Sequence, residues 1–546
     1  MKRLLLILFF SFCVSIPVIL PFLHAGYFPT HDGEWAVVRF GDMFRTIRDL
    51  QIPARFSGNL NFGYGYPLFN FTYPFPYYFG IIFHFLGFGF VNTIKMLFAG
   101  SVVFSAFFMF FAAKLLWKNT WAGIVSSICY VYFPYRMVDL YVRGSVGESM
   151  SFVLFPLLFY LAIKLIEKPS LLLVFWIAVS TGILVITHNI MTVLFVPLYW
   201  VFILIQSALK NRKAIKSFFI SIILGFGLSA FFWIPAIFEK NNILLSQIPI
   251  ADRNLYFVKL EQFIFPRWGY GVPTDPNGFS YQLGLVHLAI FIIAVLSLLF
   301  LLIKNNKHLT DHSVKIACTL TIIAVFYIFL LFKPSEFLWK NIPLLSEINY
   351  PWIVLGILGF LISLLAGFLS RQISGKYAMV LLGVIAVFLV LPYAKPQYYF
   401  DKEDNYYLTN DATTTSSNEL MPLWVKKIPL QRPVSKVEII SGEGNVGEVS
   451  YNSKQINFSI NALTEADLKI NTIYYPGWKI SVDKVNTEIS YSNEQGVMEI
   501  LIPSGNHIVS GRFEETPLRL ISDIISLSSF FMLLLLMIKR NKYAFF

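Results

Sequence analysis

The chain has 546 residues, of which 56% are hydrophobic, 17% aromatic and only 14% charged, and its mean hydropathy is +0.64. Soluble globular domains carry about 25% charged residues, so this composition excludes an ordinary soluble protein and indicates a polytopic membrane protein. The formal net charge of +12 does not indicate a nucleic-acid partner, because the clustered Lys and Arg residues lie in short loops between apolar runs, where they set membrane topology.

Apolar runs long enough to cross about 30 Å of hydrocarbon recur from end to end. Placing the basic loops inside predicts about twelve spans with both ends of the chain inside. The spans are expected near residues 4–23, 93–115, 119–134, 149–167, 170–187, 189–208, 216–238, 283–303, 314–332, 351–369, 377–393 and 517–538. The first run exceeds the roughly 7–15 residues of a signal-peptide core, so an uncleaved span is favoured over a signal peptide ending near Ala25.

The predicted outer loop at residues 24–92 is unusually long and rich in polar and aromatic residues. Within it, the segment from Tyr73 to Phe88 is apolar, but counting it as a span would put later basic loops on the wrong side. We therefore expect a helix that lies in the membrane interface. Residues 1–394, with this loop, form the predicted multi-span membrane domain.

The composition changes at about Lys395, where long apolar runs give way to polar residues. Alternating segments at residues 449–460, 468–472, 478–482 and 497–502 have the period of two that is typical of strands. They predict an all-β, sandwich-like domain at residues 395–515 on the outer side. Residues 516–546 are expected to form the final span and a basic cytoplasmic tail.

Unusual polar residues fall on the outer side of this topology, at the level of the lipid headgroups. Ionisable residues at membrane depth are costly and need a functional or a pairing explanation. The candidates are His31, Asp32, Glu34, Arg39, Tyr64, Tyr66, Arg136, Asp139, Arg143, Glu148, His188 and Glu239. A carboxylate there can act as a general base, and arginines can hold a phosphate by charge-assisted bonds.

Each candidate also has a plain structural alternative. Asp32 or Glu34 can be a solvated loop acid or a helix cap, and the charges at residues 136–148 can simply form ion pairs. His188 can be a satisfied polar residue at a helix end, and the glycines beside Tyr64 and Tyr66 can be turn formers. The tryptophans in these regions are expected to be interface anchors: Trp35, Trp268 and Trp352.

Several ordered motifs resemble a family of bacterial membrane proteins that carry a 6-pyruvoyl-tetrahydropterin-synthase-related domain, although nothing here resembles pterin chemistry. The motifs are His31-Asp32-Gly33, the run from Asn61 to Phe69, the run from Tyr135 to Glu148, Thr187-His188-Asn189 and Phe232-Trp233-Ile234-Pro235. The architecture is similar to the GT-C superfamily of integral-membrane glycosyltransferases. The resemblance covers residues 1–394, and the turns at Tyr475-Pro476-Gly477-Trp478 and residues 503–507 resemble the outer β domain that often follows.

The resemblance implies a glycosyltransferase of the bacterial cytoplasmic (inner) membrane that moves a sugar from a polyprenyl-phosphate donor to a cell-envelope glycan or lipid acceptor. It maps the first-loop carboxylate that acts as the base onto Asp32, with Glu34 second, and the phosphate ligands onto Arg143 and Arg136. Two positions depart from the family pattern: Ile353 stands where relatives carry an arginine, and residues 55–61 lack the usual tryptophan and aspartate.

Two other function classes stay open. A non-catalytic protein that binds or carries a lipid-linked glycan would need the same outer surface without the base. A transporter is less favoured, because strong acids are scarce in the predicted spans. No cofactor is expected, and a divalent metal has no support in the sequence.

Overall fold

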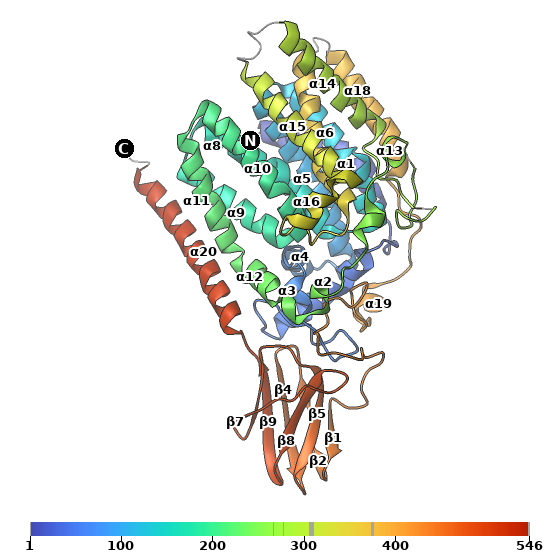
Figure 1. The fold of residues 1–546 in the computed structure, drawn as a ribbon, viewed down its shortest axis with the longest axis vertical. Helices are drawn as coiled ribbons and strands as arrows, with labels where there is room; N and C mark the ends of the chain where they lie inside the picture. The colour runs from blue at the N-terminus through green and yellow to red at the C-terminus, as the bar shows by residue number, and fades with distance from the viewer. Residues whose placement is uncertain (1, 266, 277, 305–310, 373–375, 544–546) are drawn as a thin grey trace.

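The computed structural model describes residues 2–265, 267–276, 278–304, 311–372 and 376–543. Long helices form one elongated bundle, and a β domain lies at one end of it (Figure 1). The chain is therefore a polytopic α-helical membrane protein with an all-β domain near its C-terminus, as the composition and the strand pattern predict.

Apolar helices lie at all twelve predicted span positions. Among the described residues, eight helices are long and apolar enough to cross a membrane, or nine if one bent pair counts as a span, and three shorter apolar helices occupy the remaining positions. The helices are α1 (Lys2–Ile19), α5 (Phe90–Trp117), α6 (Thr120–Val131), α8 (Val146–Glu167), α9 (Leu171–Thr187), α10 (Asn189–Lys210), α11 (Lys213–Leu228), α12 (Ala230–Phe238), α14 (Leu285–Lys304), α15 (His312–Leu331), α17 (Leu355–Gln372), α18 (Lys376–Val390) and α20 (Pro517–Tyr543).

The segment predicted to form a span at residues 216–238 is bent, because the axis changes direction by 69° between α11 and α12. The Ser229 hydroxyl donates to the Gly225 carbonyl at 3.1 Å, which competes with the regular helix ladder. The backbone N–H of Phe231 donates to Ser526 Oγ on α20 at 2.8 Å, and its carbonyl accepts from Arg55 at 2.5 Å. Side chains from other elements therefore form hydrogen bonds with the backbone groups of Phe231 at the break.

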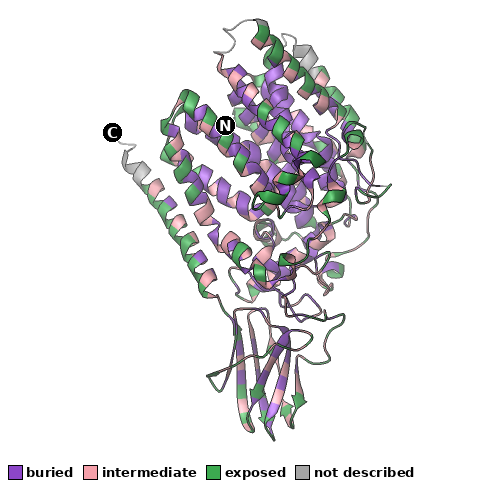
Figure 2. Cartoon of the chain, viewed as in Figure 1, coloured by how far each residue is buried: buried purple, intermediate pink, exposed green. Residues whose placement is uncertain are grey.

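Helix α17 is the centre of the bundle. All residues from Leu355 to Ser370 are buried, and the helix packs against α6, α14 and α15. Figure 2 shows the same distribution, with buried residues concentrated inside the bundle and exposed ones along α20. An apolar helix with no exposed face is typical of the core of a large helical membrane protein.

The outer loop contains three helices that position the candidate site. They are α2 (Gly33–Arg48), α3 (Leu68–Phe71) and α4 (Phe75–Phe85). Helix α4 has 11 residues, too few for a span, and matches the predicted interface helix. Smaller helices elsewhere are α7 (Pro134–Val138), followed by one π-helical turn at residues 139–143, α13 (Leu260–Ile264), α16 (Glu336–Asn341) and α19 (Asp404–Leu408).

The β domain is a sandwich of two antiparallel sheets. One has the strand order β1 (Val437–Ser441), β5 (Ala466–Ile473), β8 (Val497–Ile502). The other has the order β2 (Gly444–Val446), β4 (Gln455–Ala462), β9 (Gly505–Phe513), β6 (Trp478–Val482), β7 (Val485–Thr487), with β3 (Ser450–Tyr451) also paired to β4. The predicted single strand at residues 449–460 is wrong in one respect: Asn452 Oδ1 accepts from the N–H groups of Lys454 and Gln455 at 2.9 Å, and this turn separates β3 from β4.

Residues 395–436 connect the bundle to the first strand and lie against the outer loop. Phe62 donates its N–H to the Asp411 carbonyl, and Arg45 donates to the Leu408 carbonyl. After β9, α20 returns along α9, α11 and α12 (Figure 1). Helix α1 begins and α20 ends away from the β domain, in keeping with the predicted topology; which side is cytoplasmic stays a prediction.

Candidate functional site

The loop that carries His31 and Asp32 is held against residues 142–143 by two backbone hydrogen bonds. The N–H of His31 donates to the Val142 carbonyl at 2.9 Å, and the N–H of Asp32 donates to the Arg143 carbonyl at 2.7 Å. Thr30 Oγ1 accepts from the N–H of Gly33 at 2.8 Å, where α2 begins. We call this arrangement, residues 30–33 with residues 142–144, the backbone clamp.

Gly144 makes the clamp possible. Its φ is +68°, and a Cβ there would lie 2.3 Å from Thr30 Oγ1 and 2.7 Å from the Gly33 nitrogen. A side chain at this position meets both backbone strain and a clash. Gly144 therefore explains how two segments more than a hundred residues apart in the sequence come into contact.

Asp32 carries the least engaged carboxylate of the site. It is half-buried as the N-cap residue of α2, and within the described part of the chain its side chain has no hydrogen bond or ion pair. Its charge acts on Arg39, Arg143 and Glu148. It also acts on Tyr73 and Tyr77, and burial raises the pKa of both phenols, so they are neutral donors. This carboxylate is available to a ligand.

Arg143 keeps hydrogen-bond donors free although it is ion-paired. Its Nη1 donates to Tyr135 Oη at 3.2 Å and to Glu148, and lies 3.9 Å from Asp139 Oδ1. Its guanidinium carbon lies 4.9 Å from the ring centroid of Trp352. Nε and Nη2 donate to no residue that the structure describes, and the side chain is 12% exposed. Those nitrogens can contact an oxyanion beside Asp32.

His188 lies behind this cluster. It is the N-cap residue of α10, where its Nδ1 accepts from the N–H of Met191 at 3.2 Å, and its ring centroid lies 5.1 Å from that of Tyr73. Burial, together with the Arg143 charge, lowers the pKa of His188 to about 3. The imidazole is therefore neutral and serves as an acceptor.

Arg39 and Tyr66 meet at Thr414 of the connecting segment. Arg39 Nε donates to Thr414 Oγ1 at 3.1 Å, and Tyr66 Oη lies 3.0 Å from the same oxygen. His31 Nε2 lies 3.0 Å from the Tyr270 carbonyl, at the exposed rim. The structure thus joins eight of the predicted positions in one cluster, directly or through Arg39 and Arg143: His31, Asp32, Arg39, Tyr66, Asp139, Arg143, Glu148 and His188.

Four predicted positions face other partners. Glu34 lies 3.5 Å from Lys402 Nζ, and Arg136 is sealed in the bundle, donating to Ser105 Oγ at 3.1 Å and lying 4.8 Å from the Phe152 ring centroid. Tyr64 is buried, and its carbonyl accepts from Ile473 of β5 at 2.9 Å. Glu239 accepts from Arg519 at 2.8 Å and from Asn70 at 2.7 Å. These contacts join elements together.

Sequence reasoning missed some residues of the cluster. Tyr73, Tyr77, Tyr350 and Thr414 lie near the Asp32 and Arg39 side chains. Tyr77 lies in α4, whereas Tyr73 precedes that helix, so helical spacing gave no signal that the two phenols share a site. Trp352 is not an interface anchor: it is 4% exposed and packs beneath Arg143.

Within the described ranges, no group of three or more His, Cys, Asp or Glu side chains is placed to hold a metal ion.

Comparison with known proteins gives distant similarities. No protein-family model matches the chain, so membership of the family that the motifs resemble stays a prediction. An uncharacterized protein of Lactococcus lactis subsp. cremoris (strain MG1363) is 24% identical over 324 residues, which is 58% of this chain and 51% of that protein. The chain therefore spans about half the length of this relative.

Two solved structures share part of the architecture. The arabinofuranosyltransferase AftD from Mycobacteria has a TM-score of 0.41 at 16% identity, over 74% of this chain and 28% of AftD. The Archaeoglobus fulgidus oligosaccharyltransferase in the apo form has a TM-score of 0.41 at 11% identity, over 77% of this chain and 61% of that protein. We draw no functional argument from similarities of this size.

Proposed function

We propose that the protein is a membrane glycosyltransferase that moves a sugar from a polyprenyl-phosphate donor to a cell-envelope acceptor on the outer face of a bacterial cytoplasmic membrane. The observation that carries the proposal is the Asp32 carboxylate, which no described residue pairs with and which the backbone clamp holds beside Arg143. The motif resemblance to GT-C enzymes supports the same reading.

In the proposed reaction Asp32 accepts the proton of an acceptor hydroxyl while that oxygen attacks the anomeric carbon of the donor sugar. The bond between the anomeric carbon and the phosphate oxygen breaks, and the configuration inverts. Nε and Nη2 of Arg143 stabilise the charge that develops on the leaving polyprenyl phosphate. The neutral phenol of Tyr73, which is partly exposed, donates a hydrogen bond to the sugar.

The test is transfer of radiolabelled sugar from a panel of polyprenyl-phosphate sugars, by purified protein with membrane acceptors present. Asp32→Asn keeps the shape of the side chain and removes the base, so transfer should fall by about 10²- to 10⁴-fold. Asp467→Asn makes the same chemical change on the surface of β5 and should transfer at the wild-type rate. Undiminished transfer by Asp32→Asn contradicts the assignment.

A non-catalytic glycan-binding protein is the second candidate, favoured by the ion pairs that Arg143 already makes with Glu148 and Asp139. It predicts equal donor binding by wild type and Asp32→Asn, with no transfer by either protein to any acceptor.

A further inference from the structure

A polar pocket lies at the C-terminal end of α2, between the outer loop, the connecting segment and the β domain. Its volume is about 400 Å³, within the range of small-molecule sites. Its charged and aromatic lining comes from three elements: Asp42, Arg45 and Asp49 from α2 and its C-cap, Arg432 and Lys436 from the connecting segment, and Tyr451 from β3. None of these residues belongs to the cluster around Asp32.

Two buried side chains in the pocket wall each leave one oxygen without a hydrogen bond to the described residues, although the Asp42 carboxylate also interacts with Ser57 and Arg45. Asp42 is 2% exposed and Ser453 is 4% exposed, and neither Asp42 Oδ2 nor Ser453 Oγ forms a hydrogen bond with any residue that the structure describes. Leaving such groups unpaired is destabilising, more so for a charged group. Burial raises the pKa of Asp42 to about 6, which reflects the same cost. A ligand that donates hydrogen bonds to these oxygens removes the cost of leaving them unpaired.

The lining selects against strongly charged ligands. An anion that approaches Arg45 and Lys436 is repelled by the carboxylates of Asp42 and Asp49. A cation that approaches those carboxylates is repelled by Arg45 and Lys436. Lys436 Nζ already donates to the Gly63 and Asn471 carbonyls at 2.7 and 2.8 Å. A neutral ligand with many hydroxyls fits this mixture, because each hydroxyl both donates to carboxylates and accepts from Lys and Arg.

We propose that this pocket binds a sugar residue of the glycan acceptor. The inference rests on the proposed function and deepens it by naming the acceptor class. Ten residues of α2 separate Asp42 from Asp32, so the pocket lies roughly 15 Å along the helix from that carboxylate. A glycan held here from the aqueous side can extend towards Asp32, while the lipid-linked donor approaches from the bundle.

The first test is saturation-transfer NMR on the purified full-length protein, without donor. The probes are methyl glycosides and disaccharides of glucose, galactose, mannose and rhamnose. Wild type, Asp32→Asn and the Asp467→Asn control should bind at least one probe. Asp42→Asn should bind it about tenfold more weakly, since a hydrogen bond to a charged group is worth roughly 1.5–3 kcal/mol.

Arg432→Ala provides a second variant that does not disturb the interior, because its side chain is 53% exposed at the rim. It should also weaken binding. No binding of any probe by wild type, or equal binding by wild type and both pocket variants, overturns the inference.

Transfer kinetics separate this inference from the proposed function. Asp42→Asn should raise the KM for acceptor and leave kcat and the KM for the polyprenyl-phosphate donor unchanged. Sugar binding without transfer by any variant would refute the glycosyltransferase and leave the pocket assignment standing. Transfer with an unchanged acceptor KM in Asp42→Asn would refute the pocket assignment and leave the glycosyltransferase standing. A raised donor KM would assign the pocket to the donor sugar.

Discussion

Arg143 and Arg136 illustrate how burial decides what two similar residues can do. Both come from the same predicted outer turn, and the resemblance assigns both to the donor phosphate. Arg143 is 12% exposed, whereas Arg136 is 1% exposed and packs on Phe152. The residue types were readable from the sequence. Their accessibility was not, because it depends on which helices close over each side chain.

His188 gives a prediction about pH. Its folded pKa of about 3 lies below the ordinary value of 6.5, so the fold favours the neutral imidazole. Its contribution to stability is complete above pH 6.5 and is lost as the pH falls towards 3. Lowering the pH from 7 to 5 should therefore cost wild type about 2 kcal/mol through this group. His188→Asn retains a capping acceptor and should lose less stability over the same change in pH.

Thermal unfolding in detergent at pH 7 and pH 5 checks this expectation. His507→Asn is the matched control: the Asp483 carboxylate raises the pKa of His507, so that pair contributes stability at low pH and loses it as the pH rises. The two substitutions should shift the pH dependence in opposite directions. Equal pH sensitivity in wild type and His188→Asn would contradict the His188 argument.

The backbone clamp is the element that presents Asp32, and Gly144 tests it. Gly144→Ala should push Thr30 and Gly33 away, because the added Cβ would lie within 3 Å of both. Sugar transfer should fall at least tenfold while the protein remains inserted and folded. Gly87→Ala is the control, since Gly87 also has a positive φ of +95° but open space around its Cβ. An equal loss of transfer activity in the two variants would mean that backbone strain at a positive φ causes the loss, and not the clash with the clamp.

The sequence predicted where the helices and strands lie better than it predicted which of them are in contact. Apolar run length located the spans and the interface helix, and alternation located most strands. The glycines at Gly63 and Gly65 have positive φ, as the structural alternative for that patch predicts. The pairing of residues 31–32 with residues 142–143 could not be predicted, since local patterns carry no information about which distant loops meet. The break at Ser229 depends in the same way on partners from α20 and the outer loop.

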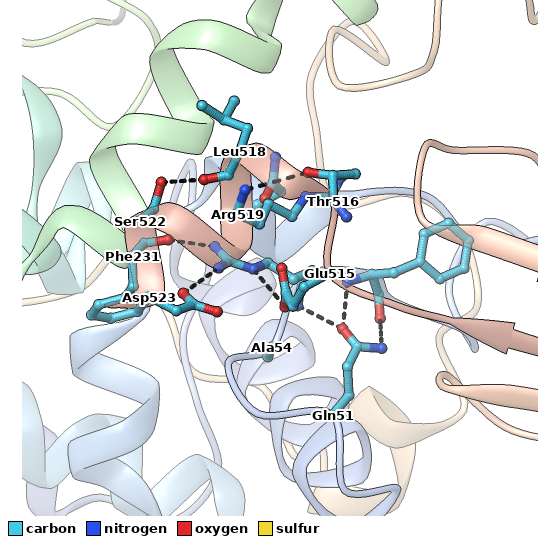
Figure 3. Close-up of polar contacts among 12 residues, drawn as sticks. Gln51, Ala54, Phe231, Glu515, Thr516, Leu518, Arg519, Ser522 and Asp523 are labelled. Carbon is cyan, nitrogen blue, oxygen red and sulfur yellow. Dashed lines mark hydrogen bonds and ion pairs between the residues drawn. The ribbon is translucent and has the colours of Figure 1, made fainter. Parts of the chain in front are cut away.

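At the scale of the whole molecule, buried charges join the β domain and α20 to the outer loop. Arg55 pairs with Glu515 at 3.3 Å and with Asp523 at 2.9 Å. Figure 3 shows Asp523 of α20 beside Phe231 of α12, and Glu515 in the segment that precedes α20. Arg519 on the same helix pairs with Glu239. Phe56 adds an apolar contact, with its ring centroid 5.3 Å from that of Phe513. The junction fixes the β domain beside the pocket at the C-terminal end of α2.

Arg55 provides the test of this junction, because it is 1% exposed and serves two carboxylates. Arg55→Met would leave Glu515 and Asp523 without their partner, and removing one member of a buried ion pair costs on the order of 3–5 kcal/mol. Lys479→Met breaks the exposed Lys479–Glu514 pair, whose side chains are 63% and 47% exposed, and should cost about 0–1 kcal/mol. The measurements are thermal unfolding and the rate at which a protease cleaves residues 395–436. Faster cleavage and a lower Tm in Arg55→Met alone support a rigid junction. Equal cleavage rates and equal Tm values in the two variants would mean that apolar contacts and backbone hydrogen bonds hold the sandwich in place without the Arg55 ion pairs.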